Sequence, residues 1–402
     1  MNKNAIWLLA LGLGLRVVPA RAAVDCRTLP NSVVVTGSTA IKPVLAEIAK
    51  VLAVPQSNGS TETGPVTVLY AGAGSCVGID AAVNGTPVTS ATLAYWDGQG
   101  AEQACALDST SGGLNADVAV SDVFASTCLP LPNGLPNNVH DFLGPIQTMT
   151  FVVPQASKQD SISAEAAYYV FGFGADSGVA PWTNAAQIFR RSAQSGTQRL
   201  LAAAIGVDAT LWQGTEASSS SDLRQRLIAA GSNDPESTIG ILAADEAQAN
   251  RATLNVLAYQ DFGQACASYP DRELDSNEKE NVRSGVYLPW GPMHLLTAVD
   301  NNQHPTNHLA ETLISYILGN QAPPGGLDLI ALEAQRFVVP QCAMRVQRSQ
   351  EMGPVMPFTP SQPCGCYYEK LANTSTSCKP CESNRDCTAD NSICSYHFCE
   401  TL

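Results

Sequence analysis

Short apolar runs alternate with amphipathic stretches along the chain, and each run has the length of a β-strand. After the first run, apolar residues recur from Ile41 to Leu52 at spacings of three and four, which is the spacing of one helical face. Pro43 is acceptable only near a first turn, so we expect this helix to begin around Ser38 to Ala40. The strands predicted in this part of the chain are Ser32–Thr36, Val66–Tyr70, Ala116–Val120 and Met149–Pro154. This alternation predicts an α/β protein.

The second half continues the pattern. A helix-forming run begins at Ser195 or Thr197 and is closed by Gly206, and Asp222 begins a second helix that ends near Ala230. A third helix is expected from about Thr306 to Leu318. The apolar segment Tyr287–Val299 reads as another strand.

Two of the predicted strands have a connecting role. Met149–Pro154 would carry the chain into a second domain, and Tyr287–Val299 would bring it back, so the two crossings imply a hinge. The roughly 340 residues before the tail allow one large domain or two medium domains. The resulting division is residues 23–152 and 288–348 for lobe 1, 153–287 for lobe 2, 349–363 for a linker and 364–402 for a cysteine-rich tail.

Small hydroxyl residues and glycines lie where strands end and helices begin. These segments are Gly37-Ser38-Thr39, Gly74-Ser75, Ser121-Asp122 and Arg191 to Thr197. The unpaired N–H groups of a helix's first turn and an arginine fork together favour a tetrahedral oxyanion. The competing interpretation is that these residues only cap helices and that Arg190 and Arg191 are solvated.

Other chemistry finds less support. Gly72-x-Gly74-x-x-x-Gly78 is a loose dinucleotide fingerprint, but Asp97 is a poor stand-in for the acid that binds ribose, and the same glycines would let a backbone approach an anion. His304 and His308 are separated by a proline and have no evident third metal ligand. We therefore expect no metal and no cofactor. An exported phosphatase-like enzyme would need a metal cluster or an activated nucleophile, and we find neither in the sequence.

Composition and charge narrow the class of partner. Apolar residues make up 45% of the chain, enough for a large core, and the net charge is −14. Nucleic acids and anionic membrane surfaces demand basic patches, so we expect neither as a partner. A small anion is still allowed, because local donors decide an anion site in a cleft.

The first 22 residues resemble an export signal. Lys3 precedes an apolar run that ends at Leu15, and Ala20-Arg21-Ala22 fits the small-x-small pattern of a cleavage site. The apolar run is too short to span a bilayer. We expect residues 1–22 to be a signal peptide and the mature protein to be exported, either to the periplasm or to the outer cell surface.

Thirteen cysteines in an exported chain indicate disulfides. Six lie in the body and seven in the tail, so at least one is free, lipidated or paired between the groups or between chains. Residues 84–113 are rich in small residues and read as a surface excursion, which Cys105 would staple to Cys76 or Cys128. In the tail, zinc at Cys378-x-x-Cys381 is the rival of disulfides, which an oxidising compartment favours.

The order and spacing of the four hydroxyl-bearing segments resemble the periplasmic phosphate-binding proteins of the high-affinity phosphate ABC transporter. Arg190-Arg191-Ser192-Ala193-Gln194-Ser195-Gly196-Thr197 is close to that family's Arg-Arg-Ala-Asp-Gly-Ser-Gly-Thr. Tyr70-Ala71-Gly72-Ala73-Gly74-Ser75 is close to its Tyr-x-Gly-x-Gly-Ser. The resemblance covers roughly residues 30 to 345 and leaves out the tail.

The resemblance implies a type II periplasmic-binding-protein fold, with two α/β lobes, mixed sheets and a two-strand hinge. It implies capture of inorganic phosphate, or a related protonated oxyanion, between the lobes without catalysis. The ligand-binding residues that it implies are Thr39, Ala40, Ser75, Asp122, Arg191, Ser195, Gly196 and Thr197. Asp122 would accept the proton of the ligand. A membrane permease of an ABC transporter is the implied partner, and we expect a monomer.

Two departures from the family pattern are visible. Ala193 stands where the family places an acid beside its arginine, so Arg191 lacks the carboxylate that would orient it. The stretch between Ser75 and Asp122 is about thirty residues longer than usual, enough for a flap over the cleft. The alternative function is a secreted or surface interaction protein that keeps this fold and binds an unknown partner through its tail.

Overall fold

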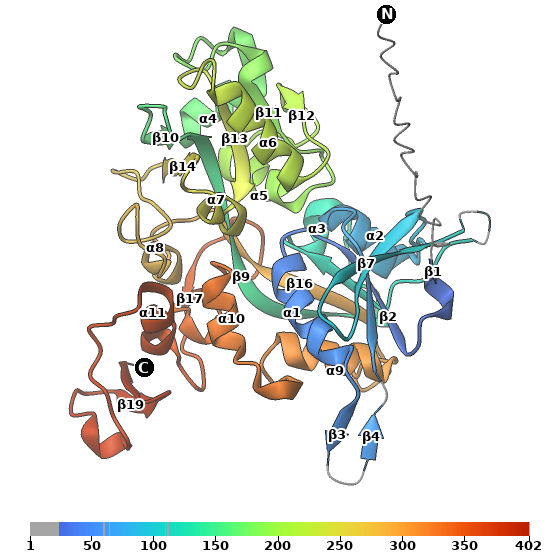
Figure 1. The fold of residues 1–402 in the computed structure, drawn as a ribbon. Coiled ribbons are helices and arrows are strands. Elements are labelled where there is room, and N and C mark those ends of the chain that lie inside the picture. Colours follow the sequence, from blue (N-terminus) through green and yellow to red (C-terminus); the bar gives the residue numbers. More distant parts are fainter. Residues whose placement is uncertain (1–23, 59–60, 64, 109, 111, 402) are drawn as a thin grey trace, which may run out of the picture.

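In the computed structural model, 24–58, 61–63, 65–108, 110 and 112–401 are the residues described (Figure 1). The predicted signal peptide, residues 1–22, lies outside them. None of the helices in the described ranges is long and apolar enough to cross a membrane. The fold is α/β, with two lobes joined by two central strands and a disulfide-rich region at the C-terminus (Figure 1).

One mixed sheet extends through both lobes. Among the described residues it has twelve strands in the order β1-β7-β6-β5-β2-β8-β16-β9-β13-β11-β12, and β14 also pairs with β9. In chain order these strands are β1 (Val24–Asp25), β2 (Ser32–Gly37), β5 (Thr67–Ala71), β6 (Thr92–Trp96), β7 (Glu102–Ala106), β8 (Val118–Ser121), β9 (Val139–Pro154), β11 (Ile188–Arg190), β12 (Thr215–Glu216), β13 (Ile239–Ala243), β14 (Leu254–Val256) and β16 (Trp290–Ala298).

Helices and short hairpins complete the fold. The α-helices are α1 (Lys42–Leu52), α2 (Ser75–Asn84), α3 (Ala125–Cys128), α4 (Ala164–Phe173), α5 (Gly196–Ile205), α6 (Ser220–Gly231), α7 (Ala244–Ala249), α8 (Glu280–Arg283), α9 (His308–Ile317), α10 (Leu329–Gln335) and α11 (Gly365–Asn373). Small two-stranded sheets pair β3 (Gln56–Asn58) with β4 (Thr61–Thr63), β10 (Ser161–Ser163) with β15 (Ala258–Gln260), β17 (Val346–Gln347) with β18 (Met356–Pro357), and β19 (Ser392–Ser395) with β20 (Phe398–Thr401).

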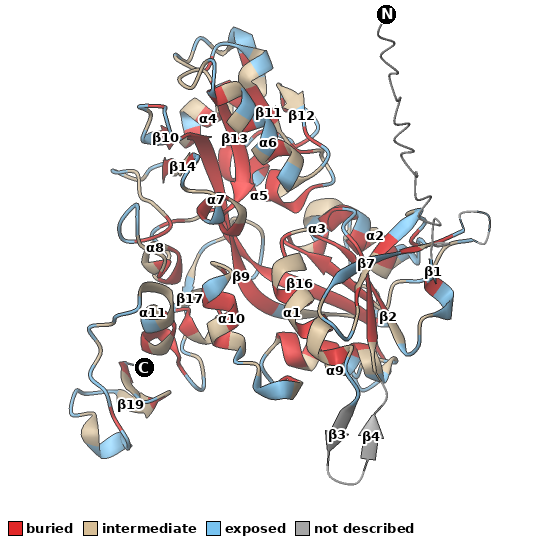
Figure 2. Cartoon of the chain, viewed as in Figure 1, coloured by how far each residue is buried: buried red, intermediate tan, exposed pale blue. Residues whose placement is uncertain are grey.

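Lobe 1 is built on β2, which runs parallel to β5 and β8. Val33 and Val35 lie in one apolar cluster with α1 and α9, whereas Val34 lies in another cluster with β6 and β7. Successive side chains of a strand point to opposite faces, so covering both faces explains the continuous apolar run. The buried strands are the red arrows of Figure 2.

The long strand β9 connects the lobes. Its residues Val139–Thr148 pair with β16, and Met149–Val152 pair with β13 of lobe 2 (Figure 1). Both predicted crossings are therefore strands of the shared sheet. They position the ends of β8 and β11, where the predicted site residues lie.

The excursion predicted for residues 84–113 is wrong. This segment forms β6 and β7, which extend the sheet beyond β5, so the added length builds a sheet edge and not a flap. The staple predicted for Cys105 is also wrong, because Cys105 pairs with Cys26 and Cys76 pairs with Cys128. The pair Cys26–Cys105 belongs to the short pairing of β1 with β7, which the sequence pattern did not reveal.

The tail is held to the body by covalent and polar contacts. The disulfide Cys342–Cys364 links the two cysteine groups, and three further disulfides close the tail at Cys366–Cys378, Cys381–Cys394 and Cys387–Cys399. These pairs confirm the expectation that disulfides form in the tail. Cys266 is exposed and is not in a disulfide.

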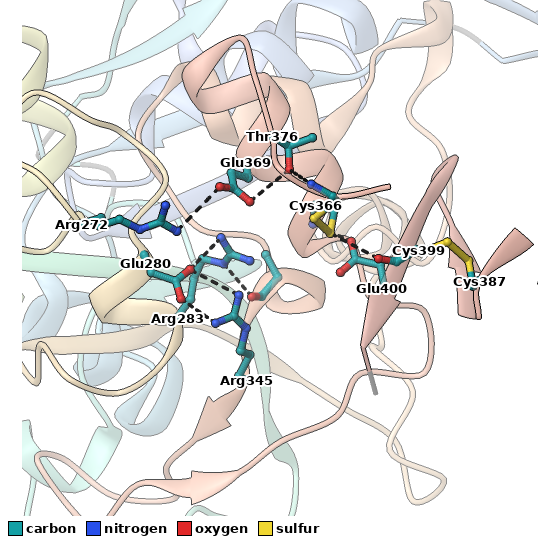
Figure 3. The surroundings of a disulfide bond; sticks show 12 residues. Arg272, Glu280, Arg283, Arg345, Cys366, Glu369, Thr376, Cys387, Cys399 and Glu400 are labelled. Carbon is teal, nitrogen blue, oxygen red and sulfur yellow. Dashed lines mark hydrogen bonds and ion pairs between the residues drawn. A yellow bond between two sulfur atoms is a disulfide. The ribbon is translucent and has the colours of Figure 1, made fainter. Parts of the chain in front are cut away.

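Charged groups attach α11 to the body (Figure 3). Arg272 Nη2 lies 3.8 Å from Glu369 Oε1, and Asn373 Nδ2 donates to Glu278 Oε2 at 2.5 Å. Tyr368 of α11 is fully buried in the main apolar cluster. The tail therefore contributes to the core and is not an independent appendage.

Candidate functional site

Ends of strands and beginnings of helices from both lobes meet at one place. In lobe 1, β2 leads into a turn before α1, α2 begins directly at Ser75, and β8 ends beside Asp122. In lobe 2, β11 ends before Arg191, and Ser195 is the N-cap of α5. First-turn N–H groups have no partner within their own helix, so α2 and α5 each bring hydrogen-bond donors to this region.

Direct contacts join the two lobes here. The backbone N–H of Cys76 donates to the carbonyl oxygen of Gln194 at 3.1 Å. A Cβ placed on Gly196 would lie 2.2 Å from Ser75 Oγ and 2.7 Å from Asp122 Oδ2. Only a residue without a side chain permits this approach, so the beginning of α5 rests against Ser75 and Asp122.

Asp122 is buried, and hydroxyl groups surround its carboxylate. Ser38 Oγ donates to Oδ1 at 2.5 Å and Ser75 Oγ donates to Oδ2 at 3.2 Å. Burial raises the pKa of Asp122, and the two serine hydrogen bonds and the charge of Arg191 oppose that rise. The backbone N–H of Asp122 donates to Ser75 Oγ at 3.1 Å, so this carboxylate is fixed in position.

Arg191 is 5% exposed, although it carries a charge. Its Nη1 donates to Ser220 Oγ at 2.7 Å, and its buried Nε has no partner within the described part of the chain. Burial lowers the pKa of Arg191, and attraction to Asp122, then to Asp222 and Glu216, opposes the shift. The guanidinium therefore retains unused hydrogen-bonding capacity in a buried place.

Ser220 orients the guanidinium of Arg191, for which the sequence had offered no partner at Ala193. Ala193 offers no carboxylate, but the hydroxyl of Ser220, at the start of α6, accepts a hydrogen bond from Arg191. Thr39 Oγ1 lies 3.5 Å from the same hydroxyl, so Ser220 contacts both lobes. The serine run at 218–221 was visible in the sequence, but no spacing rule links it to Arg191.

Seven of the eight predicted site residues lie in two connected groups. Thr39 reaches Arg191 through Ser220, and Ser75, Asp122 and Gly196 are packed together. Ser195 and Thr197 are buried beside Gly196 on α5. The backbone N–H of Ala40, predicted to bind the ligand, donates instead to Ser38 Oγ at 3.1 Å. Ser38 belongs to the predicted segment Gly37-Ser38-Thr39 but had no predicted role. Its contacts with Asp122 and Ala40 make it part of the site.

The fold has two α/β lobes joined by two strands of a shared mixed sheet, with groups suited to an oxyanion where the lobes meet. No family model matches the sequence, and no curated protein matches it either. Solved structures that are similar include a putative phosphate ABC transporter substrate-binding protein with bound phosphate from Clostridium perfringens, at 12% identity and a TM-score of 0.48. The overlap covers 77% of this chain and 99% of that chain.

Two further similar structures have comparable coverage. An ABC-type phosphate transport receptor from Vibrio cholerae is 15% identical, with 76% of this chain and 99% of that chain covered and a TM-score of 0.44. PstS from Borrelia burgdorferi is 15% identical, with 77% and 98% covered and a TM-score of 0.40.

Proposed function

We propose that the protein is an extracytoplasmic solute-binding protein that captures inorganic phosphate, or a related protonated oxyanion, between its lobes without catalysis. One observation carries the proposal: a buried arginine with an unpartnered Nε lies at the same interlobe contact as a buried carboxylate. Arg191 comes from lobe 2 and Asp122 from lobe 1, so a ligand that bonds both would hold the lobes together.

The pairing of an arginine with an acid selects among anions. Arg191 and the first N–H groups of α5 favour negative charge. Asp122 would repel an anion unless that anion donates a hydrogen bond to it, which hydrogen phosphate does and fully ionised sulfate does not. A buried charge that faces a like charge without a hydrogen bond costs several kcal/mol, so we expect a selectivity of about 10³ or more for phosphate.

The available donors are sufficient for tight binding. Micromolar affinity corresponds to about 8 kcal/mol. Hydrogen bonds to charged groups contribute about 1.5 to 3 kcal/mol each, and the site offers Arg191, Thr197, Ser195 and the α5 N–H groups as donors. We infer that these groups exceed the cost of ordering the two lobes around the ligand.

Export and a membrane permease of an ABC transporter complete the proposed role. The sequence pattern of residues 1–22 supports export. The proposal of a permease partner rests on the sequence resemblance, which also supports a monomeric receptor. The body of the protein would deliver the bound anion, and the chemistry of the anion would stay unchanged.

Isothermal titration of the purified full chain tests the proposal. Phosphate should bind at micromolar concentration with a stoichiometry of about one, and sulfate should bind at least about 10³-fold more weakly. Arg191→Gln should abolish binding, whereas Arg385→Gln, a change of an exposed tail arginine, should leave it intact. Absence of phosphate binding to protein whose disulfides have formed would overturn the proposal.

A further inference from the structure

A cavity lies where lobe 1 meets the linker and the tail. Its volume is about 580 Å³. The walls come from the first part of β9, the C-terminal end of α9, α10, the segment Phe358–Gln362 and Tyr396 of the tail. Cavities of about 300 to 1,000 Å³ are the usual size for small-molecule sites.

The lining of this cavity carries acids and amides but no base. Neither lysine nor arginine is among the described residues that line it, whereas Asp328 and Glu333 are. Gln341, Gln362 and Asn320 supply amide groups, and leucine, isoleucine, proline and phenylalanine form the remaining wall. The cavity thus has a mixed polar and apolar lining whose only ionisable groups of strong charge, in the described part of the chain, are acids, which disfavours anions.

Glu333 is the unusual member of the lining. It is 2% exposed, and its Oε2 has no hydrogen-bond partner in the described structure. Arg336, one turn further along, is directed elsewhere, because its Nη2 bonds Glu47 of α1 at 2.7 Å. Burial raises the pKa of Glu333 well above its usual range, and repulsion from Asp328 adds to the rise. A buried carboxylate without a counter-ion is costly, so the Glu333 carboxyl group favours its neutral form until a cation pairs with it.

Asp328, by contrast, is already bonded at both oxygens. Its Oδ1 accepts the N–H of Ala331 at 3.0 Å as the cap of α10, and its Oδ2 accepts the hydroxyl of Tyr367 at 2.6 Å. The ring of Tyr367 stacks on Tyr396, with centroids 5.5 Å apart and planes 5° apart. Tyr396 therefore presents a fixed aromatic wall, and Glu333 is the acid left with an unused oxygen.

We propose that this cavity binds a small organic cation, a primary amine on an apolar body, with Glu333 as its counter-ion. Oε2 is covered in the described structure, so the Glu333 side chain would turn toward the cavity for an ammonium group to donate to Oε2, and the amide oxygens would accept the remaining N–H groups. The hydrocarbon part would lie against the apolar wall and the face of Tyr396, where aromatic rings also attract cations. Such a ligand satisfies the buried carboxylate, whereas a neutral or anionic ligand of equal size leaves it unpaired.

The proposed site also gives the C-terminal segment a role. Phe358, Gln362 and Tyr396 all belong to the segment that follows lobe 1 in sequence. Gln341 donates to the carbonyl oxygens of Leu143 at 2.6 Å and Gly144 at 2.9 Å, so the cavity adjoins β9. The linker and tail thus complete a pocket that lobe 1 alone would leave open.

Calorimetric titration of the full chain with 2-phenylethylamine tests the proposal, with 2-phenylethanol as a neutral probe of matched shape. Measurements use a buffer at pH 7.5 that contains neither phosphate nor a primary amine. We expect the amine to bind at least about tenfold more tightly than the alcohol, the ratio that 1.4 kcal/mol would give. Equal binding of the two probes, or no binding of the amine at millimolar concentration, would overturn the proposal.

Glu333→Gln is the decisive variant, because it preserves shape and removes the charge. It should weaken amine binding at least about tenfold and leave the alcohol unaffected. Glu311→Gln, on an exposed position of α9 outside the cavity, is the matched control and should change neither. Amine binding that survives in Glu333→Gln would refute the assigned counter-ion. Unchanged phosphate binding in that variant would show that it is folded and would separate this site from the interlobe one.

Discussion

Replacement of Gly196 by alanine tests the interlobe contact directly. Gly196 lies at the first position of α5, and the added methyl group would lie 2.2 Å from Ser75 Oγ and 2.9 Å from Asp122 Cβ. A methyl carbon does not approach an oxygen or another carbon atom this closely, so α5 must move away from lobe 1. Rotation of the Ser75 hydroxyl alone does not relieve the contact with Asp122 Cβ.

The magnitude follows from what the retreat disrupts. Overpacking of a well-packed contact costs about 1 to 3 kcal/mol, and loss of the interlobe hydrogen bond from Cys76 N–H to the Gln194 carbonyl oxygen adds about 1 kcal/mol. We take about 2 kcal/mol for the penalty on the closed, ligand-bound state. This corresponds to a phosphate dissociation constant about 30-fold higher.

The assay combines calorimetry with thermal denaturation. Gly196→Ala should weaken phosphate binding and reduce the rise in melting temperature that phosphate causes. The melting temperature without phosphate should change little, since the affected contact lies between lobes and not within a core. Gly172→Ala is the matched control, because its added Cβ lies at an ordinary 3.4 Å from Val207 within lobe 2.

One result would refute the reasoning. If Gly196→Ala binds phosphate as tightly as the parent protein while remaining folded, α5 does not press on Ser75 and Asp122 in the bound state. The site would then have to be assigned elsewhere.

Three further predictions concern single side chains. Asp122→Asn should relax discrimination against sulfate, because an amide can donate to an anion that carries no proton; competitive calorimetry with both anions measures this, and unchanged selectivity would contradict the role of Asp122. Ser220→Ala should weaken phosphate binding about tenfold, since Arg191 loses the hydroxyl that orients it and one hydrogen bond is worth about 1 to 1.5 kcal/mol; calorimetry that finds no loss would show another group orients the guanidinium. Burial raises the pKa of Glu351 from 4.5 to about 7, so its stabilising contribution is complete below 4.5 and is lost as the pH rises through 7. The melting temperature should fall less between pH 5 and pH 8 in Glu351→Gln than in the parent protein, and an equal fall would argue against this assignment.

Local patterns predicted the elements of the fold well. The run Ser32–Thr36 became β2, and the apolar face after Ile41 became α1, although that helix begins only at Lys42, after a turn. Gly206 closes α5 in the left-handed conformation that a glycine adopts without steric cost. Helices and buried strands have spacings that a single sequence displays, so these elements were accessible without the structure.

Pairings between segments that are distant in the sequence could not be predicted from the sequence. β6 and β7 lie in a stretch of the chain that is rich in small residues, and they extend the sheet because β6 pairs with β5 and β7 pairs with β6. The partner of Cys105 depends on the same edge, where β1 adds to β7. Neither the pairing of these strands nor the partner of Cys105 can be predicted from local sequence, because strand propensity is set largely by neighbours across the sheet.

The site was predicted in part. The hydroxyls and Arg191 could be picked out because they adjoin strand ends and helix starts, where donors for anions gather. Ser220 could not be picked out from the sequence, because its contact with Arg191 depends on how α6 packs against the end of β11. Ala40 is an opposite example. It lies in one of the predicted segments, but its backbone N–H donates to Ser38 Oγ within the turn.

The two disulfides of lobe 1 interleave, and this affects biosynthesis. In order of synthesis the cysteines are Cys26, Cys76, Cys105 and Cys128, yet Cys26 pairs with the third and Cys76 with the fourth. A chain oxidised as it emerges would join Cys26 to Cys76 first and trap an incorrect isomer. Correct maturation therefore requires either oxidation after β7 and β8 are in place or an enzyme that reshuffles the first bond, because uncatalysed thiol–disulfide exchange is slow. The yield of correctly folded protein should thus depend on disulfide isomerase activity in the compartment where it folds.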